Sequence, residues 1–282
     1  MSKVKKRFVL YTVIMILLSF LVAAARSVML LESLGDDPTF TVHSELFYAV
    51  DRFWKPAFGA VILLGVLSFF FFRKNSADLV CEKTVSGWEK TACFLCAACF
   101  FICFLILFTQ QVYRTLVQHD RSVFGFWALI DSVLLLPSGI YFLCRGLGKT
   151  GQNIAVLSFF PSVWTVIALM LSYFSDDYSL INPTRILGNL ALACASLLFL
   201  SEVRQYTNYR PSSLYLTILF PSFTVTAAYG ISLAVTSFLW IGKAPDVPFT
   251  GELVLLPVSF LIFTKLISMI SNKKNNENSE AL

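Results

Sequence analysis

Long apolar runs, separated by short polar segments, dominate the pattern of hydrophobic and polar positions along the chain. Each run is close to the roughly 20 residues that a helix needs to cross a bilayer. None of them alternates with a period of two residues, so helices are favoured over the strands of a membrane barrel. The runs lie at residues 8–31, 56–73, 87–112, 123–144, 152–174, 184–203, 211–241 and 252–271. The pattern predicts an all-α transmembrane bundle of about eight spanning helices.

Lysine and arginine residues concentrate in alternate polar segments, beginning with the cluster KVKKR at 3–7. Basic residues favour cytoplasmic segments, so the pattern predicts that both termini are cytoplasmic. The first apolar run extends to Leu31. It is therefore longer than the apolar region of a signal peptide, which has about 7–15 residues. An uncleaved first helix is therefore favoured, and cleavage near residues 23–25 is the alternative. Residues 1–271 are expected to form one domain, and residues 272–282 a disordered cytoplasmic tail.

Composition supports a lipid environment. Hydrophobic residues make up 57% of the 282 residues and charged residues only 14%, whereas soluble domains are about 45–50% apolar and about 25% charged. The net charge of +5 could indicate nucleic acid, but the basic residues flank the apolar runs, as expected for a membrane protein. The predicted partner is the lipid bilayer, with other membrane subunits as further candidates, and not nucleic acid. The chain contains no Asn-x-Ser/Thr glycosylation site, which fits a bacterial cytoplasmic membrane.

The segment between the first two runs allows two interpretations. In the sequence HSELFYAVDRFWKP, apolar residues share one helical face. They could form a short interfacial helix that begins at Ser44, or extend the second spanning helix, with Trp54 in the aromatic belt. The extension is favoured, and Pro56 is expected in the first turn of the spanning helix.

Four cysteines, in the sequence CFLCAACFFIC at 93–103, have the spacing of an iron–sulfur loop. The surrounding residues require a helix, on which these cysteines form a stripe about 15 Å long that one cluster cannot span. Cys93, Cys96, Cys99 and Cys103, with Ala92, Glu89 and Gln110, are therefore predicted to form a small-residue packing face. Neither a metal site nor a cofactor is predicted, and the two histidines, His43 and His119, are assigned to outer loops.

Asp131 is the most promising polar residue, because it lies well inside the fourth run. A carboxylate there should face the bundle interior, pair with a cation or bind a proton. Arg26 lies at a similar depth, so an Asp131–Arg26 pair that holds two helices together is the favoured interpretation. A proton or cation site that includes Ser138, on the same helical face, is the alternative.

Prolines and basic residues near the inner helix ends provide weaker candidates. Pro137, Pro161, Pro221 and Pro257 would each free a helix carbonyl, which can line a binding cavity or simply mark a kink. The dipeptide Pro-Ser recurs at 137–138, 161–162 and 221–222 at similar depth. Lys265 is expected to extend its amine to the interface, with a buried partner as the alternative. In the turn GLGKTGQN, Lys149 is expected to meet lipid headgroups together with the preceding Arg145.

The region 159–222 resembles a loose family of uncharacterised multi-pass membrane proteins from clostridial-type bacteria. The cues are the Pro-Trp helix in FFPSVWTVIALMLSYFSDD, the helix end LLFLSEVR and the basic turn that follows it. The resemblance implies a membrane location and no activity.

Three functional classes stay open. The first is transport, a permease subunit or small-molecule binding within the bundle, using Asp131 and the proline kinks. The second is a sensory or assembly component that acts through protein contacts. The third, an intramembrane enzyme, is the weakest, because histidines and buried carboxylates are scarce.

Overall fold

The structure is a computed structural model, and it describes residues 3–33, 45–73, 86–119, 122–149, 152–174, 183–206, 213–239 and 251–271. These residues are helical apart from short caps and turns, and they contain no strand, which confirms the all-α prediction. The elements are α1 (Lys3–Ser33), α2 (Glu45–Phe72), α4 (Gly87–Leu116), α5 (Val123–Gly146), α6 (Gln152–Leu157), α7 (Phe159–Phe174), α8 (Pro183–Tyr206), α9 (Ser213–Leu239), the 3-10 helix η1 (Gly251–Val254) and α10 (Leu255–Ser271). The predictions for His43, Ser44 and the tail 272–282 lie outside this part of the chain.

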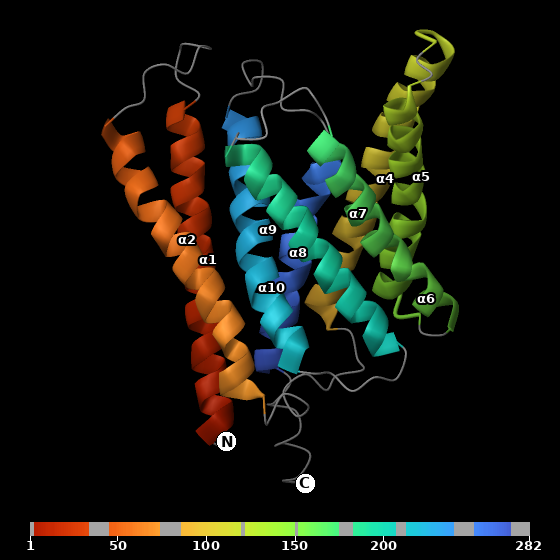
Figure 1. The fold of residues 1–282 in the computed structure, drawn as a ribbon. Helices are drawn as coiled ribbons and strands as arrows, with labels where there is room; N and C mark the ends of the chain where they lie inside the picture. The colour runs from red at the N-terminus through yellow and green to blue at the C-terminus, as the bar shows by residue number, and fades with distance from the viewer. Residues whose placement is uncertain are drawn as a thin grey trace.

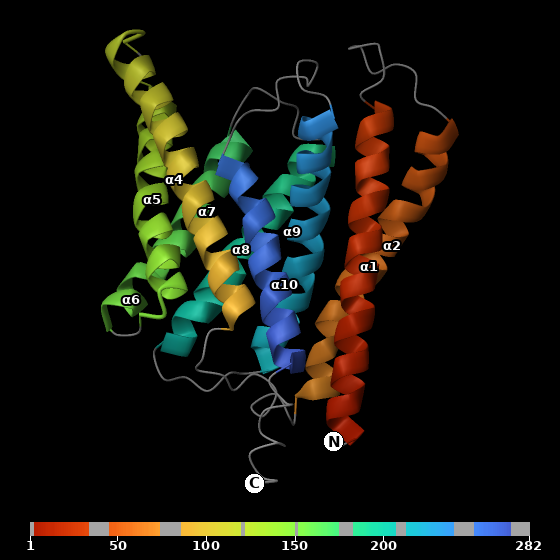
Figure 2. The ribbon, with the colours of Figure 1, turned by 180° about the vertical axis from the view of Figure 1, so that it is seen from behind.

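The long helices lie side by side in one bundle, with α1 and α2 at one edge and α4 and α5 at the other (Figures 1 and 2). Helix α9 lies in the middle, where it packs against α1, α2, α8 and α10. In the apolar span of α9, 78% of the residues are buried, whereas the share is 22–44% in the other six long spans. A helix this enclosed has no face to present to water, which explains why the run at 211–241 contains no charged residue.

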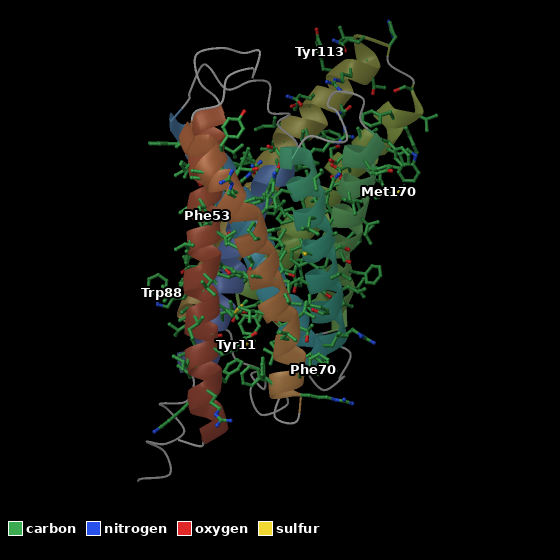
Figure 3. The ribbon with its side chains drawn as sticks, turned by 60° about the vertical axis from the view of Figure 1, so that its left-hand side comes forward. Tyr11, Phe53, Phe70, Trp88, Tyr113 and Met170 are labelled. Atoms are coloured by element: carbon green, nitrogen blue, oxygen red, sulfur yellow. The ribbon has the colours of Figure 1, made fainter. Side chains whose placement is uncertain are left out.

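Seven of the described helices are long and apolar enough to cross a membrane. The eighth, α10, has 17 residues and follows η1, so it is shorter than the predicted run at 252–271. Large apolar side chains cover the outside of the bundle, including Phe53, Phe70 and Trp88, which are 72%, 72% and 71% exposed (Figure 3). A face this apolar requires lipid as its solvent, and the protein is a multi-pass membrane protein. We call the end with the start of α1 the inner end and the opposite end the outer end.

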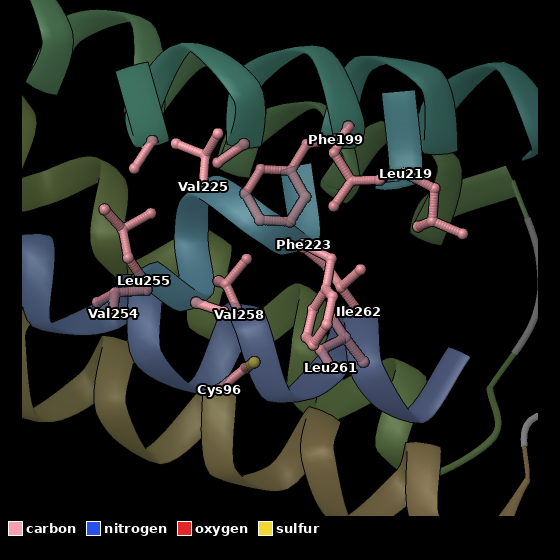
Figure 4. Close-up of a cluster of buried hydrophobic side chains, with 14 of the residues drawn as sticks. Cys96, Phe199, Leu219, Phe223, Val225, Val254, Leu255, Val258, Leu261 and Ile262 are labelled. Carbon is pink, nitrogen blue, oxygen red and sulfur yellow. The ribbon is translucent and has the colours of Figure 1, made fainter. Parts of the chain in front are cut away.

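The cysteine stripe packs against other helices, as the small-residue interpretation predicts. Cys93, Cys96 and Cys103 are at most 1% exposed. Cys96 points from α4 toward α10, close to Val258 (Figure 4). Among the described residues, no group of His, Cys, Asp or Glu side chains could hold a metal ion.

Close approach between helices depends on small residues and hydroxyl groups. A Cβ added at Gly230 would lie 2.9 Å from the Leu256 Cα, so α9 and α10 touch backbone to backbone there. Ser19 of α1 and Thr224 of α9 share a hydrogen bond of 2.8 Å. The Tyr11 hydroxyl donates to the Leu64 carbonyl and joins α1 to α2.

The prolines have different structural consequences. Helices α5 and α9 continue through Pro137 and Pro221. The run at 152–174 is instead interrupted at Ser158, three residues before Pro161, which separates α6 from α7. Pro257 does not kink a spanning helix, because it lies in the first turn of α10, where a missing N–H costs little.

Helix α2 extends outward to Glu45, so the extension interpretation of segment 45–55 is correct. The prediction for Pro56 is wrong, since this residue lies inside α2 rather than in its first turn. The Trp54 side chain does more than anchor an interface. Its indole N–H donates to the Val22 carbonyl of α1 at 3.1 Å, and its ring stacks on Phe58.

Candidate functional site

Four charged side chains from four helices meet near the inner end of the bundle. Glu89 of α4, Arg145 of α5, Glu202 of α8 and Lys265 of α10 form what we call the charge tetrad. Arg145 bridges the two carboxylates: its Nη2 is 2.6 Å from Glu89 Oε1, and its Nη1 is 2.6 Å from Glu202 Oε2. Lys265 pairs with the other carboxylate oxygen of Glu202. Two acids therefore balance two bases.

The tetrad is buried. The side chains of Glu202 and Lys265 are 2% and 6% exposed, and those of Glu89 and Arg145 are 9% and 13% exposed. Tyr141, one turn before Arg145, accepts a hydrogen bond from its Nη1 at 3.1 Å. The Tyr141 hydroxyl also lies 3.4 Å from Glu202 Oε2. Paired charges in so dry a place attract strongly, but removing one partner leaves a charge that water cannot solvate.

Local sequence explains why two of these groups meet at the same height. Ser86 caps α4 by accepting a hydrogen bond from the Glu89 backbone N–H at 3.2 Å, which places Glu89 in the first turn. Helix α5 ends just after Arg145, where Gly148 adopts a φ of 69° and its N–H bonds to the Arg145 carbonyl at 2.9 Å. Because α4 starts and α5 ends at the inner end, Glu89 and Arg145 face each other.

Two predictions about these residues are wrong. Arg145 does not meet lipid headgroups, since both of its terminal nitrogens contact buried carboxylates. Lys265 does not extend to the interface, and the alternative, a buried partner, is correct. Glu202 was not predicted at all. It lies within about two helical turns of the end of α8, as Lys265 does for α10, so comparing the depths of opposite charges could have identified it.

Asp131 lies on α5, toward the outer end, and is 7% exposed. Its neighbour is the indole of Trp164 on α7. Within the described residues, however, neither Asp131 Oδ1 nor Trp164 Nε1 has a hydrogen-bond partner. No cation among the described side chains forms an ion pair with Asp131. The part of the chain that the structure describes thus gives this carboxylate inside the membrane no countercharge.

The predicted pair between Asp131 and Arg26 does not form. Helix α1 packs against α2 and α9, whereas α5 packs against α4 and α7, at the other edge of the bundle. Arg26 instead donates from Nη2 to Thr184 Oγ1 at 2.9 Å and lies over the Trp54 ring, 5.3 Å from its centroid. The similar depth of Arg26 and Asp131 was therefore not sufficient evidence of contact.

The serines of the three Pro-Ser dipeptides act as helix contacts. Ser138 donates to the Leu134 carbonyl of its own helix at 2.8 Å, so this hydrogen bond does not link it to Asp131. Ser162 of α7 and Ser222 of α9 donate to carbonyls of α8, at Ser196 (3.4 Å) and Cys194 (3.1 Å). Two of the three dipeptides thus hold α8 between its neighbours.

An apolar groove of about 370 Å³ lies between the outer ends of α5 and α7. Its lining consists of Val123, Phe124, Trp127, Ile167, Met170, Leu171 and Phe174. The hairpin of α4 and α5 also rises beyond the outer ends of the other helices (Figures 1 and 2). Tyr113 and Leu116, near its tip, are 56% and 68% exposed. His119 is exposed as well, as expected for an outer loop.

No family model, curated protein or solved structure matches this chain. The resemblance of residues 159–222 to clostridial-type membrane proteins therefore stays a prediction.

Proposed function

We propose that this protein is a transporter-like or permease-like protein of the bacterial cytoplasmic membrane, with both termini inside, and that Asp131 binds the coupling proton. The observation that carries the proposal is the buried Asp131 carboxylate, which has no cation among the described residues and an oxygen without a hydrogen-bond partner. Ionisable residues inside a membrane face the bundle interior and typically serve ion or proton pathways.

The surroundings of Asp131 favour a proton over a metal cation. Hard cations such as Ca²⁺ or Mg²⁺ take about six or more oxygen ligands. Asp131 contributes one carboxylate, and no cluster of metal-binding side chains exists among the described residues. The adjacent Trp164 indole can donate but cannot ligate a cation. One proton suffices to neutralise the carboxylate in place.

The proposal is tested with purified protein in liposomes that contain a pH-sensitive dye. A potassium diffusion potential drives proton entry, which we expect in wild-type vesicles and not in vesicles with Asp131→Asn. The matched control is Asp51→Asn, which removes a carboxylate paired with Lys55 near the outer end of α2. Two results contradict the proposal. One is a proton flux in wild-type vesicles no greater than in empty vesicles, and the other is a proton flux that Asp131→Asn leaves unchanged.

Infrared spectroscopy gives a second readout that needs no transported substrate. A neutral carboxylic acid has a C=O stretch distinct from that of a carboxylate. We expect a titrating carboxyl band that disappears in Asp131→Asn and persists in Asp51→Asn. A spectrum in which the same bands titrate in wild type and in Asp131→Asn contradicts proton binding at Asp131.

A second function, as a sensory or assembly component of a membrane complex, is supported by the α4–α5 hairpin. Its tip exposes Tyr113 and Leu116 beyond the other helices, and the apolar groove is lined by Val123 and Phe124 at the start of α5. Native mass spectrometry from detergent tests this function. Copurified protein subunits that are lost with Leu116→Ser support assembly, and a monomeric protein that keeps its proton flux supports transport.

A further inference from the structure

Arg26 is a buried cation that forms no ion pair with the residues described in the structure. It is 4% exposed, and its guanidinium lies between α1, α2 and α8 at the outer end of the bundle. Among the described residues no carboxylate forms an ion pair with it. Its Nε has no hydrogen-bond partner there either. Burying an arginine in this way costs free energy unless some anion completes the site.

Asp51, the described acid that acts on Arg26 electrostatically, does not supply that anion. Asp51 lies one turn before Trp54 on α2. It attracts Arg26 electrostatically. Its carboxylate is already bound to Lys55, with Oδ2 2.7 Å from Nζ. Asp51 and Lys55 together are neutral, so the described residues around Arg26 keep an excess positive charge.

The guanidinium is held in a fixed orientation. Trp54 lies against it, with the ring centroid 5.3 Å from Arg26 Cζ. Trp54 is itself fixed by the hydrogen bond to the Val22 carbonyl. On another side, Thr184 Oγ1 accepts from Arg26 Nη2. A guanidinium positioned in this way is ready to bind an oxyanion, because little side-chain entropy remains to be lost.

Thr184 belongs to the first turn of α8, which starts at Pro183. Helix N-termini carry partial positive charge and favour anions. The site thus combines two features. One is the buried Arg26 cation, whose Nε has no hydrogen-bond partner among the described residues. The other is the positive end of helix α8. Thr184 and Trp54 are both partly exposed, so the site can be reached from the outer side.

We propose that Arg26, Thr184 and the N-terminus of α8 form a binding site for a small oxyanion, a carboxylate or a phosphate group. The arginine contributes charge-assisted hydrogen bonds, and the helix end contributes its dipole. The same phosphate chemistry can come from a free solute or from a lipid headgroup. This site is separate from Asp131 and does not depend on the proton function.

The experiment uses the full chain in a maltoside detergent, which has no phosphate group. Sodium phosphate and sodium acetate are titrated at constant ionic strength against chloride, and thermal unfolding is followed by tryptophan fluorescence. A ligand that binds only the folded state raises the midpoint in a saturable way. A short-chain phosphatidylglycerol is titrated in parallel, and tighter binding of this lipid than of free phosphate identifies a headgroup as the source.

The variants separate the site from general charge effects. Arg26→Gln should weaken the apparent affinity about tenfold or more, the size expected for losing charge-assisted hydrogen bonds. Lys90→Gln, which removes an exposed cation at the inner end of the bundle, should change it less than about twofold. If Arg26→Gln does not fold, Thr184→Val keeps the arginine and should still weaken binding.

Three results would overturn the site. The first is a wild-type midpoint that shows no saturable dependence on phosphate, acetate or the short-chain lipid. The second is an equal dependence in Arg26→Gln or, where that variant does not fold, in Thr184→Val. The third is binding that emerges only after Asp176→Asn and Asp177→Asn, two residues outside the described part of the chain that precede α8 in the sequence. This last result would assign the anion to the chain itself.

Discussion

Replacing Glu202 with glutamine tests the charge tetrad most directly. Glu202 is the residue that both cations share: Arg145 bonds to one carboxylate oxygen and Lys265 to the other. Glu202→Gln keeps the size of the side chain and one acceptor oxygen but removes the negative charge. Two cations then face the single carboxylate of Glu89, in a position where the Glu202 side chain is 2% exposed.

The magnitude follows from what the variant leaves behind. Each hydrogen bond to a charged partner contributes about 1.5–3 kcal/mol, and the amide oxygen of glutamine can replace only part of the two that are lost. Removing one member of a buried ion pair costs about 3–5 kcal/mol, because the remaining charge has neither partner nor water. We therefore expect Glu202→Gln to lower the free energy of unfolding by about 3–5 kcal/mol.

A double replacement separates the charge effect from the loss of contacts. Glu202→Leu combined with Lys265→Leu removes one acid and one base and leaves the Glu89–Arg145 pair intact. Since no charge stays uncompensated, the double variant should be more stable than Glu202→Gln, although it loses more polar contacts.

The assay is reversible unfolding in mixed micelles by increasing fractions of dodecyl sulfate, followed by tryptophan fluorescence. Asp51→Asn is the control, because it breaks a pair in which Lys55 is 65% exposed and should cost at most about 1 kcal/mol. A loss below about 1 kcal/mol for Glu202→Gln, or a double variant less stable than the single one, would refute the reasoning.

Three further predictions concern the packing and use the same assay. Arg145→Lys keeps the charge but cannot contact both carboxylates with one planar group, so a loss of about 1.5–3 kcal/mol is expected. Gly230→Ala should cost about 1–3 kcal/mol because its Cβ would meet the backbone of α10, whereas Gly59→Ala, with open space around it, should be neutral or slightly stabilising. Cys96→Leu should destabilise more than Cys96→Ala, since the thiol packs toward α10; equal effects would argue against a small-residue contact.

The helices could be predicted because lipid imposes one simple requirement. A segment that crosses the membrane must be apolar over its length and must satisfy its own backbone, so the span is visible in the sequence. The ends of the helices were harder to predict where packing against a neighbouring helix determines where a helix begins. Pro56 looks like a helix start, but α2 continues outward to Glu45 because Trp54 packs on α1.

Polar contacts inside the bundle were harder to predict, because the sequence supplies depth and not lateral position. Arg26 and Asp131 have similar depth, but they lie on helices at opposite edges of the bundle. Arg145 and Lys265 lie close enough to the ends of their helices to reach the membrane interface. Only the arrangement of the helices shows that the carboxylates of Glu89 and Glu202 lie nearer to them than the interface does. Depth thus limits the possible partners, and helix packing decides among them.

The two ends of the bundle treat charge differently. At the inner end, four charges from α4, α5, α8 and α10 neutralise one another, and separating these helices would expose ions to a dry interior. Toward the outer end, Asp131 and Arg26 lie on different helix groups, and neither forms an ion pair within the described residues. Unpaired charges gain free energy from a ligand of opposite charge, and paired charges do not. If the two proposals hold, a proton at Asp131 and an anion at Arg26 therefore act on the outer half of the bundle, whereas the tetrad at the inner end is already neutral.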